Sequence, residues 1–402
     1  MNKKKKNKTT EIPIGPYHPL QEEPEFFRLK VDGEKVLGLD IELGYNHRGI
    51  EKLSEGKNYD QVLFLVERIC GICSTSHPFA YVNAVEELGG IEIPGRAKYI
   101  RSVVGEMERI HSHLLWMGLA GHFLGYNTVW MWCWKYREPL LDLCEEVFGN
   151  RQHYGMMKIG GARRNISVKQ GDKIQKAMDD IEPQVDMLEK AIKDDPVLRA
   201  RLKVAGTLPK KEARQYCVVG PTARASGIKM DIRKSDPYAA YDQIEWEVPV
   251  KKEGDVYAKT MVRLEEIRQS TRIINQCVDK LKNISGDIDI QIKDIPEGQG
   301  IGRHEAPRGE VFHYVRSYGG SVPYRHKIRA PSFQNVLSNE VAVIGGTIPD
   351  AAITLAAVDP CYCCTERMQA VAKDGREYSS KELIELSKNK TEKMREKMEQ
   401  DS

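Results

Sequence analysis

The sequence lacks a hydrophobic run long enough to cross a membrane. A membrane-spanning helix needs about 20 consecutive apolar residues, whereas the most apolar late stretch, residues 341–358, is repeatedly interrupted. The interrupting residues are Gly345, Gly346, Pro349 and Asp350. No apolar segment follows the N-terminal lysines either, so we expect neither a membrane span nor a secretory leader.

A strong excess of one charge is also missing. Lysine and arginine total 61, and aspartate and glutamate total 58, which leaves a formal net charge of +3. A chain so nearly balanced creates no field that favours nucleic acid as its main partner. The basic excess lies in residues 3–8, which we interpret as a solvated tail, with an anionic-lipid or partner contact as the alternative.

The nine cysteines do not follow the even spacing of a disulfide framework. This absence excludes a small disulfide-stabilised domain and favours a reducing, cytoplasmic compartment, where thiols bind metals or lie buried. With 402 residues and 41% hydrophobic content, the chain is long enough to bury a large core. We therefore expect a folded protein in which some cysteines carry chemistry.

Periodic apolar patterns predict the main elements. Apolar residues alternate on both sides of Asp32-Gly33 within residues 27–43, which predicts a β-hairpin. Residues 97–148 have a helical pattern, and apolar seams with steps of three and four run through 174–192 and 264–281. These long helices predict a bundle.

The remaining sequence predicts shorter elements. We expect a strand at 310–315 and a short helix at 351–357 with Asp350 as its cap, while 203–255 indicates only loops and short elements. The predicted fold is mainly α, with a small α+β N-terminal part and a central bundle of long helices. The expected parts are a basic tail (1–11), an α+β part with the first cysteine pair (12–96), a helical bundle with an irregular insert (97–290), a C-terminal part with the second pair (291–367) and a weakly packed tail (368–402).

Two Cys-x-x-Cys pairs carry the clearest chemical signal. Cys70 and Cys73 lie in Arg-Ile-Cys-Gly-Ile-Cys, where Gly71 lets the backbone bend around an ion. Cys361 and Cys364 follow Asp-Pro near the C-terminus. Four thiolates arranged in this way predict one site for a soft metal.

Spacing alone leaves the identity of the metal open. Paired Cys-x-x-Cys motifs usually hold a tetrahedral structural zinc. Zinc ribbons close short loops, however, whereas these pairs lie near opposite ends of the chain, which indicates a site at the centre of a large fold. Thiolates suit nickel and iron as well as zinc.

Further segments accompany the cysteine pairs. Arg-Gly-Ile-Glu stands at 48–51, Glu-Ala-Pro-Arg-Gly at 305–309, His77 follows the first pair, and Asp-Pro at 359–360 precedes the second. In this order the segments resemble the signature motifs of nickel-iron hydrogenase large subunits, and the resemblance extends over 12–367. It implies the fold shared by those subunits and the complex I 49 kDa subunit.

Three local segments refine the resemblance. They are Gly-Pro-Tyr-His-Pro at 15–19, Glu-Arg-Ile-His-Ser-His at 108–113 and Gly-Pro-Thr-Ala-Arg at 220–224. These segments are most similar to the energy-converting, membrane-bound branch of the family, which is related to complex I. The histidines of 108–113 we interpret as interhelical or subunit contacts in preference to a metal-binding face.

The resemblance implies a Ni-Fe(CN)2CO centre that forms or splits H2. Cys70 and Cys361 would be terminal thiolates on nickel, and Cys73 and Cys364 would bridge nickel and iron. A structural zinc remains the alternative.

The resemblance also assigns roles around the centre. Arg308 would be a fixed cation over the cluster, Pro307 would pack against the diatomic ligands, and Asp359 would orient Arg308 or the cysteine loop. His77 would donate a hydrogen bond to a bridging thiolate. The alternatives are a surface salt bridge for Arg308 and an ordinary core histidine for His77.

Carboxylates are expected to move protons and to hold a second metal. Glu23 is the predicted first proton relay, with Glu22 as its rival, because a partly desolvated carboxylate has its pKa raised towards neutrality. Glu51 corresponds to a glutamate that binds magnesium in the standard enzymes. The last motif residue, often a histidine on that ion, is Arg367 here, so magnesium is left open.

The resemblance implies several partners. Too few cysteines remain for an iron-sulfur relay, so such clusters would lie only in partner subunits. The expected partners are an iron-sulfur small subunit, ferredoxin acting through electron-transfer subunits, and membrane antiporter-like subunits. The chain would lie on the cytoplasmic face of the membrane as a peripheral subunit, and a maturation protease would cut between Arg367 and Met368.

Three alternatives stay open at this point. A complex I-like quinone-site subunit would have the same fold without nickel. A hydrogen-evolving subunit of a formate- or carbon monoxide-linked complex would carry the same motifs. A zinc-stabilised scaffold would use the four thiolates without catalysis.

Overall fold

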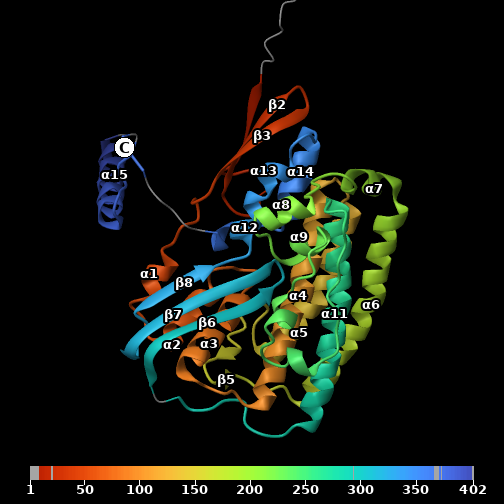
Figure 1. Ribbon diagram of the computed structural model, residues 1–402, viewed down its shortest axis with the longest axis vertical. Helices are drawn as coiled ribbons and strands as arrows, with labels where there is room; N and C mark the ends of the chain where they lie inside the picture. The colour runs from red at the N-terminus through yellow and green to blue at the C-terminus, as the bar shows by residue number, and fades with distance from the viewer. Residues whose placement is uncertain (1–8, 20, 293, 366–370, 373, 401–402) are drawn as a thin grey trace, which may run out of the picture.

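The computed structural model describes residues 9–19, 21–292, 294–365, 371–372 and 374–400. A bundle of long helices forms one side of the molecule, and a sheet covered by shorter helices lies beside it (Figure 1). The long helices are α4 (Gly95–Phe123), α5 (Asn127–Phe148), α6 (Val168–Asp194) and α11 (Val256–Asn283). The predicted mainly α fold with a central bundle is confirmed.

Helix α4 is the centre of this bundle. It packs against α5 and α11, and α11 in turn packs against α6. The apolar seams expected within α6 and α11 are buried, as Ile174 and Leu264 illustrate with no exposed surface. Burial on both sides of α4 explains why its pattern is less clearly amphipathic than that of α6, which is exposed on one face.

A three-stranded antiparallel sheet consists of β6 (Ile295–Ala306), β7 (Gly309–Gly320) and β8 (Arg325–Arg329). Helix α3 (Ser76–Gly89) packs on it so closely that a Cβ at Gly302 would lie 1.9 Å from the carbonyl oxygen of Ala80. A strand was expected only at 310–315, so that prediction was too short and missed β6. The glycines that admit α3 interrupt the apolar alternation by which a strand is recognised.

The N-terminal sheet comprises β1 (Thr10–Ile14), β2 (Phe26–Asp32) and β3 (Lys35–Glu42). The predicted hairpin is confirmed, with β2 and β3 antiparallel. Its apolar face, including Phe27, packs against Val358 and Tyr362 next to the second cysteine pair. This small sheet thus supports one side of the loop that carries the second cysteine pair.

Helix α14 (Ile348–Ala357) leads into the second cysteine pair. The predicted start at Ala351 with Asp350 as the cap was wrong, because Thr347 caps the helix and Asp350 completes the capping box. The side chain of Thr347 accepts a hydrogen bond from the Asp350 N–H, and the Asp350 carboxylate accepts from the backbone of Thr347. The helix ends before Asp359, as expected.

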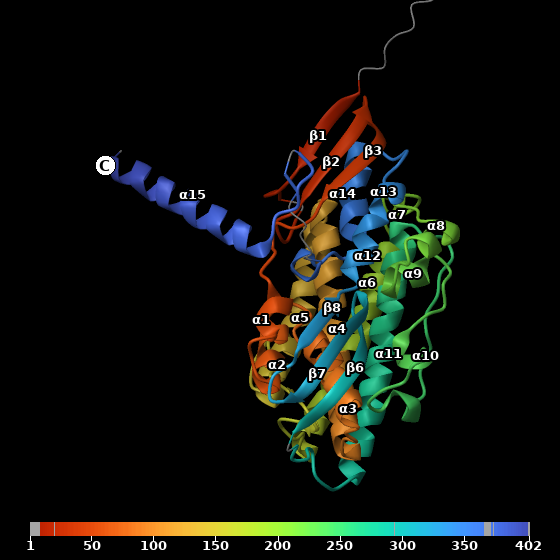
Figure 2. The same ribbon diagram turned by 60° about the vertical axis from the view of Figure 1, so that its left-hand side comes forward.

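Short elements connect these units. They are α1 (Ile50–Ser54), α2 (Tyr59–Glu67), β4 (Met157–Lys158), β5 (Gly161–Ala162), α7 (Pro196–Leu202), α8 (Lys210–Gln215), α9 (Gly220–Ala225), α10 (Ile232–Ser235), η1 (Tyr241–Gln243), α12 (Ser332–Leu337), α13 (Asn339–Ala342) and η2 (Tyr362–Cys364). A longer helix, α15 (Ser380–Gln400), follows them. Helix α15 stands away from the rest of the molecule (Figure 2). Within the described ranges, no helix is long and apolar enough to span a bilayer. The expected division into parts stays a prediction.

Candidate metal centre

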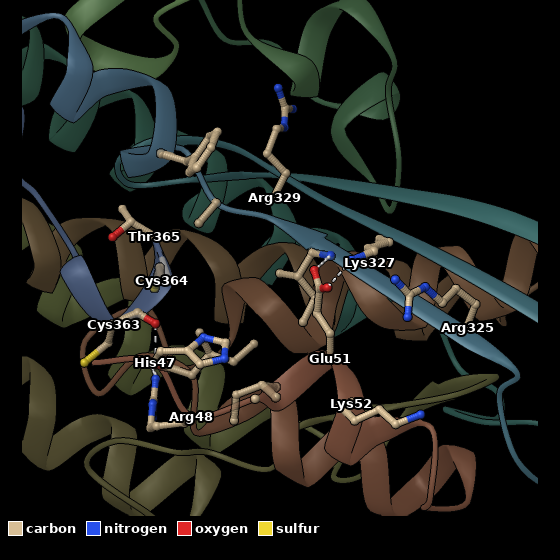
Figure 3. A pocket seen from close by; sticks show the side chains of 16 residues that line it. His47, Arg48, Glu51, Lys52, Arg325, Lys327, Arg329, Cys363, Cys364 and Thr365 are labelled. Atoms are coloured by element: carbon tan, nitrogen blue, oxygen red, sulfur yellow. Dashed lines mark hydrogen bonds and ion pairs between the residues drawn. The ribbon is translucent and has the colours of Figure 1, made fainter. Parts of the chain in front are cut away.

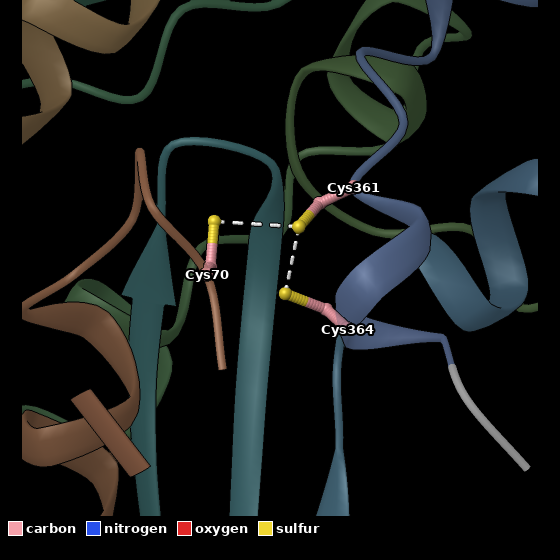
Figure 4. A group of neighbouring side chains, drawn as sticks. All are labelled: Cys70, Cys361 and Cys364. Atoms are coloured by element: carbon pink, nitrogen blue, oxygen red, sulfur yellow. Dashed lines mark hydrogen bonds between the residues drawn. The ribbon is translucent and has the colours of Figure 1, made fainter. Parts of the chain in front are cut away.

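The fold brings the two cysteine pairs together at a buried point. The first pair lies between α2 and α3, and the second follows α14. The Sγ atom of Cys361 lies 3.3 Å from Sγ of Cys70 and 2.8 Å from Sγ of Cys364 (Figure 4). Cys73 belongs to the same buried cluster, and its backbone N–H donates to Sγ of Cys70 at 3.1 Å. Residues far apart in sequence therefore form one thiol cluster.

The donor set fits a soft metal. The Sγ atoms of Cys70, Cys361 and Cys364 all lie within 4.8 Å of one another, a spacing that allows them to share one ion. Hydrogen bonds from neighbouring thiols, Cys361 foremost, hold the pKa of Cys70 well below its usual range. Buried sulfur ligands with one thiolate already favoured suit nickel, iron or zinc alike, so the surrounding residues must distinguish among these metals.

Arg308 lies at the tip of the β6–β7 hairpin. Ala306 pairs with Gly309, so Pro307 and Arg308 form the two-residue loop between the strands. The backbone of Gly309 has a φ of 126°, a conformation that favours glycine. The hairpin thereby directs Arg308 into the protein, where 3% of the residue is exposed.

The guanidinium group of Arg308 joins the two cysteine loops. Its Nη1 donates to Sγ of Cys73 at 2.8 Å and to the Ser112 hydroxyl at 3.1 Å. Its Nε donates to the carbonyl oxygen of Asp359 at 2.7 Å, and its Nη2 lies 2.6 Å from the Asp359 carboxylate. A buried cation is thus fixed against a thiol sulfur by a carboxylate from the other loop.

Helices α4 and α11 hold the second cysteine loop in place. Trp116 Nε1 donates to the carbonyl oxygen of Ala356 at 2.8 Å, and Arg263 Nη2 donates to that of Ala357 at 3.0 Å. The Arg263 guanidinium lies 3.8 Å from the centre of the Trp116 ring, which is a cation–π contact. Both side chains therefore satisfy carbonyls at the end of α14. The sequence carries no local signal for either role.

Arg48 connects the two loops from the other side. It donates to the carbonyl oxygens of Arg68 at 2.9 Å and Ile69 at 2.7 Å, just before the first pair. It also donates at 3.2 Å to the carbonyl oxygen of Cys363, inside the second pair (Figure 3). The Arg-Gly-Ile-Glu segment was identified from the sequence, but the role of its arginine was not.

Two carboxylates lie next to the centre. Glu23 accepts a hydrogen bond from the Cys363 N–H at 2.6 Å, and burial, followed by the charge on Cys70, raises its pKa. Burial, followed by the negative charge of Asp359, raises the pKa of Glu22 to about 8. Both carboxyl groups therefore have the raised pKa that a proton relay needs. These pKa shifts do not decide between Glu23 and Glu22.

The segment 108–113 serves the protein interior. Glu108 accepts from the Thr75 N–H at 2.5 Å, and burial raises its pKa to about 8. His111 Nε2 lies 2.9 Å from the Tyr154 hydroxyl, and His113 Nε2 lies 2.9 Å from Glu266 of α11. The interhelical contact expected of these histidines is confirmed for His113, whereas His111 contacts a tyrosine in the segment between α5 and β4.

The residues around Glu51 do not fit magnesium. Glu51 lines a cavity of about 390 Å³ beside the second cysteine pair (Figure 3). Its two carboxylate oxygens accept from Lys327 Nζ at 2.5 Å and from the Ile328 N–H at 2.9 Å. An ammonium group thus already balances the charge of the Glu51 carboxylate. Arg367 lies outside the described residues.

Removing the ammonium group should therefore create a cation requirement that the unmodified protein does not have. In the unmodified protein, we expect millimolar Mg²⁺ to leave Tm unchanged. The Lys327→Met variant should lose about 1 kcal/mol of stability, because the pair is partly exposed, and should regain it in millimolar Mg²⁺. Lys52→Met, in the same cavity, is the control. A Tm of the unmodified protein that rises in Mg²⁺ as much as that of Lys327→Met would contradict this account.

Comparison with known proteins shows which family the chain resembles. Residues 124–295 and 288–367 match the family described as respiratory-chain NADH dehydrogenase, 49 Kd subunit, and residues 48–119 match nickel-dependent hydrogenase. The chain is 42% identical to the membrane-bound hydrogenase subunit alpha of Pyrococcus furiosus, over 95% of this chain and 93% of that protein. It is 36% identical to the carbon monoxide-induced hydrogenase of Rhodospirillum rubrum, over 89% of this chain and 99% of that protein.

A solved structure agrees with these matches. A chain of the membrane-bound sulfane sulfur reductase, an archaeal respiratory membrane complex, superimposes with a TM-score of 0.85 and 32% sequence identity. The match covers 91% of this chain and 100% of that chain. The chain therefore belongs to the family that unites nickel-iron hydrogenase large subunits with complex I 49 kDa subunits.

Proposed function

We propose that the chain is the catalytic large subunit of a membrane-bound, energy-converting nickel-iron hydrogenase. In this proposal it reduces protons to H2, or oxidises H2, with electrons of ferredoxin type delivered by an iron-sulfur small subunit. The observation that carries the proposal is the buried Arg308 guanidinium on Sγ of Cys73 within a four-cysteine cluster. A structural zinc needs no such cation, and the identity to two hydrogenases supports the same conclusion.

The cysteines would hold the metals. In the proposed assignment Cys70 and Cys361 bind nickel only, and Cys73 and Cys364 also reach iron. A Ni-Fe(CN)2CO group bound there would supply the site at which H2 is split into a proton and a hydride equivalent, or formed from them. The protein's part is to keep this site dry and to move the proton.

Arg308 contributes a positive charge that cannot be lost. The charge of Asp359, followed by that of Cys73, holds the pKa of Arg308 well above its usual range despite burial. A fixed cation in a dry site stabilises negative charge without reorganisation at the moment of reaction. Pro307, beside it in the two-residue loop, leaves this loop little conformational freedom.

The proton would leave the centre through a carboxyl group. Glu23 stays the proposed relay because it lies against the Cys363 N–H. We expect Glu23→Gln to lower turnover by about 10²–10⁴-fold and to leave nickel and iron content unchanged. Glu22→Gln is the matched comparison. If Glu22→Gln alone lost turnover, Glu22 would be the relay and the assignment to Glu23 would be wrong.

The raised pKa of Glu22 also makes the stability of the protein depend on pH. The pKa of this carboxyl group in the folded state is about 8, against 4.5 for the ordinary group, so the folded chain binds the proton more tightly. This stabilisation is fully present below about pH 4.5 and is lost as the pH rises through about 8. Between pH 6 and 9, Tm should therefore fall less in Glu22→Gln than in the unmodified protein, as calorimetry would show.

The C-terminal tail would be removed during maturation. The proposed cut between Arg367 and Met368 lies outside the described residues, and exposed α15 follows it. We expect the intact mass of active protein to correspond to a chain ending at Arg367. A full-length mass in active protein would contradict the cleavage.

The remaining partners follow from the same proposal. The chain would lie peripherally on the cytoplasmic face of a membrane complex, beside an iron-sulfur small subunit and membrane antiporter-like subunits. One similar protein is named as a subunit of a membrane-bound hydrogenase, and a similar chain belongs to a respiratory membrane complex named for sulfane sulfur reduction. A formate- or carbon monoxide-linked hydrogenase would use this subunit in the same way.

An assay of the purified complex separates the candidate functions. With a reduced low-potential dye as electron donor, the proposal predicts H2 evolution, measured by gas chromatography. Reduction of a quinone without any H2 would instead support the nickel-free, complex I-like alternative, and reduction of sulfane sulfur without any H2 would likewise contradict the proposal.

A further inference from the structure

Three buried histidines outside the cysteine cluster form a continuous chain of hydrogen-bonding contacts. His77 belongs to α3, His313 to β7 and His326 to β8, and at most 1% of each is exposed. Nδ1 of His77 lies 3.0 Å from Nε2 of His313, and Nδ1 of His313 lies 2.9 Å from Nε2 of His326. Nδ1 of His326 lies 3.0 Å from Oγ of Ser54 in α1. The chain therefore runs from α3 to α1 along the face of the sheet that α3 covers.

Ser54 fixes the direction of this chain. A hydroxyl group has one proton to donate, and Ser54 donates it to the carbonyl oxygen of Glu51 at 2.7 Å. Its Oγ therefore has no proton left for His326 and must accept one. It follows that Nδ1 of His326 carries a hydrogen.

The protonated nitrogen of His326 determines which nitrogen donates and which accepts in the other two rings. A neutral imidazole carries one N–H and one bare nitrogen. Burial lowers the pKa of His77 to about 4 and that of His326 to about 3, and it lowers the pKa of His313 as well, so all three rings are neutral at pH 7. Nε2 of His326 is then bare and accepts from Nδ1 of His313. Nε2 of His313 accepts from Nδ1 of His77 in the same way.

We propose that Ser54, His326 and His313 are positioning residues that hold His77 as the Nδ1–H tautomer, with a bare Nε2 that accepts a proton or a hydrogen bond. This role is the reverse of the donor role that the family resemblance implies for His77. The tautomer follows from these contacts together with the neutral rings that burial favours. Its use rests on the proposed function, in which a proton leaves the nearby cysteine centre.

The chain would also let a proton taken up by His77 reach His326, although the lower pKa of His326, about 3 against about 4, means that the charge favours His77. When Nε2 takes up a proton, the Nδ1–H proton of His77 moves to Nε2 of His313, and the Nδ1–H proton of His313 moves to Nε2 of His326. No electrons move, and one positive charge is transferred from His77 to His326. Near His326, Glu55 favours that charge and Lys327 opposes it.

Nitrogen NMR of the full chain labelled with ¹⁵N-histidine tests the tautomer directly. Long-range proton–nitrogen spectra at pH 7 distinguish a protonated Nδ1 from a protonated Nε2. The variants His77→Gln, His313→Gln and His326→Gln assign the signals, and any two of them suffice if one fails to fold. We expect all three rings in the Nδ1–H form. An Nε2–H form at His77 would overturn the inference.

Ser54 variants test the anchor. Ser54→Ala should shift His77 towards the Nε2–H form, and Ser54→Thr, which keeps the hydroxyl, should restore the original tautomer. Ser338→Ala is the control, because Ser338 is equally buried and also donates to a carbonyl three residues back, at 2.6 Å. An unchanged His77 signal in Ser54→Ala would overturn the anchoring role. A chain without nickel would still show the tautomer, so a failure here is distinct from a failure of the proposed function.

Discussion

Replacing Cys361 with alanine is expected to remove nickel from the chain and to abolish hydrogen turnover. Sγ of Cys361 contacts both Cys70 and Cys364, so its loss removes one of the sulfur atoms that would hold the metal. Changes behind the ligands of a metal site already cost about 10–100-fold in affinity or activity, and the loss of a ligand should exceed that range. Elemental analysis and an H2 assay on the same preparation measure both effects.

A second buried cysteine provides the control for this experiment. Cys133 in α5 has no exposed surface, and it packs in the main apolar core outside the thiol cluster. Cys133→Ala should therefore keep its metal and its turnover, although a small cavity will lower Tm. Nickel retained in Cys361→Ala at the level of the control would show that the second cysteine pair does not hold the metal.

Replacing Arg308 with lysine should lower kcat by about 10²–10³-fold, the usual cost of losing one preorganised electrostatic donor. Lysine keeps the charge, but its single ammonium group cannot reproduce the planar guanidinium that reaches Cys73, Ser112 and Asp359 together. The Asp359 carboxylate would be left with a weaker partner in a buried place. Turnover measured with H2 and a dye, together with metal content, separates lost chemistry from lost metal.

The control lies on the neighbouring strand. Arg303 in β6 is partly exposed and pairs with Asp236 at 3.1 Å, so Arg303→Lys should have little effect. If Arg308→Lys retained full kcat, the cation alone would suffice, and the argument from guanidinium geometry would fail.

The parts of the site that the sequence predicted are those that lie in short motifs. The cysteine pairs, Arg308 and Asp359 stand next to prolines and glycines that mark turns, so their chemistry is visible locally. The fold places Arg308 at the tip of a hairpin, where Ala306 pairs with Gly309. The sequence did not predict that hairpin, because glycines obscured β6.

Other parts depend on contacts between distant residues. The hydrogen bond from Arg48 to Cys363 joins positions 315 residues apart, and no periodicity or spacing predicts it. The same holds for the Lys327 ammonium on Glu51 and for the histidine chain that ends at Ser54. The last two contacts form only because the fold places β8 against α1. They could therefore not be predicted before the tertiary arrangement was known.

The nickel and iron content of the unmodified chain tests the central claim most directly. The complex is purified first, and the chain is then separated from the partner subunits so that their iron-sulfur clusters do not contribute iron. A four-thiolate site of the proposed kind predicts nickel and iron at close to one atom each per chain, and no zinc. Zinc alone would show a structural site. The absence of any metal would assign the chain to the nickel-free members of its family, and either result would contradict the proposal that this chain catalyses hydrogen chemistry.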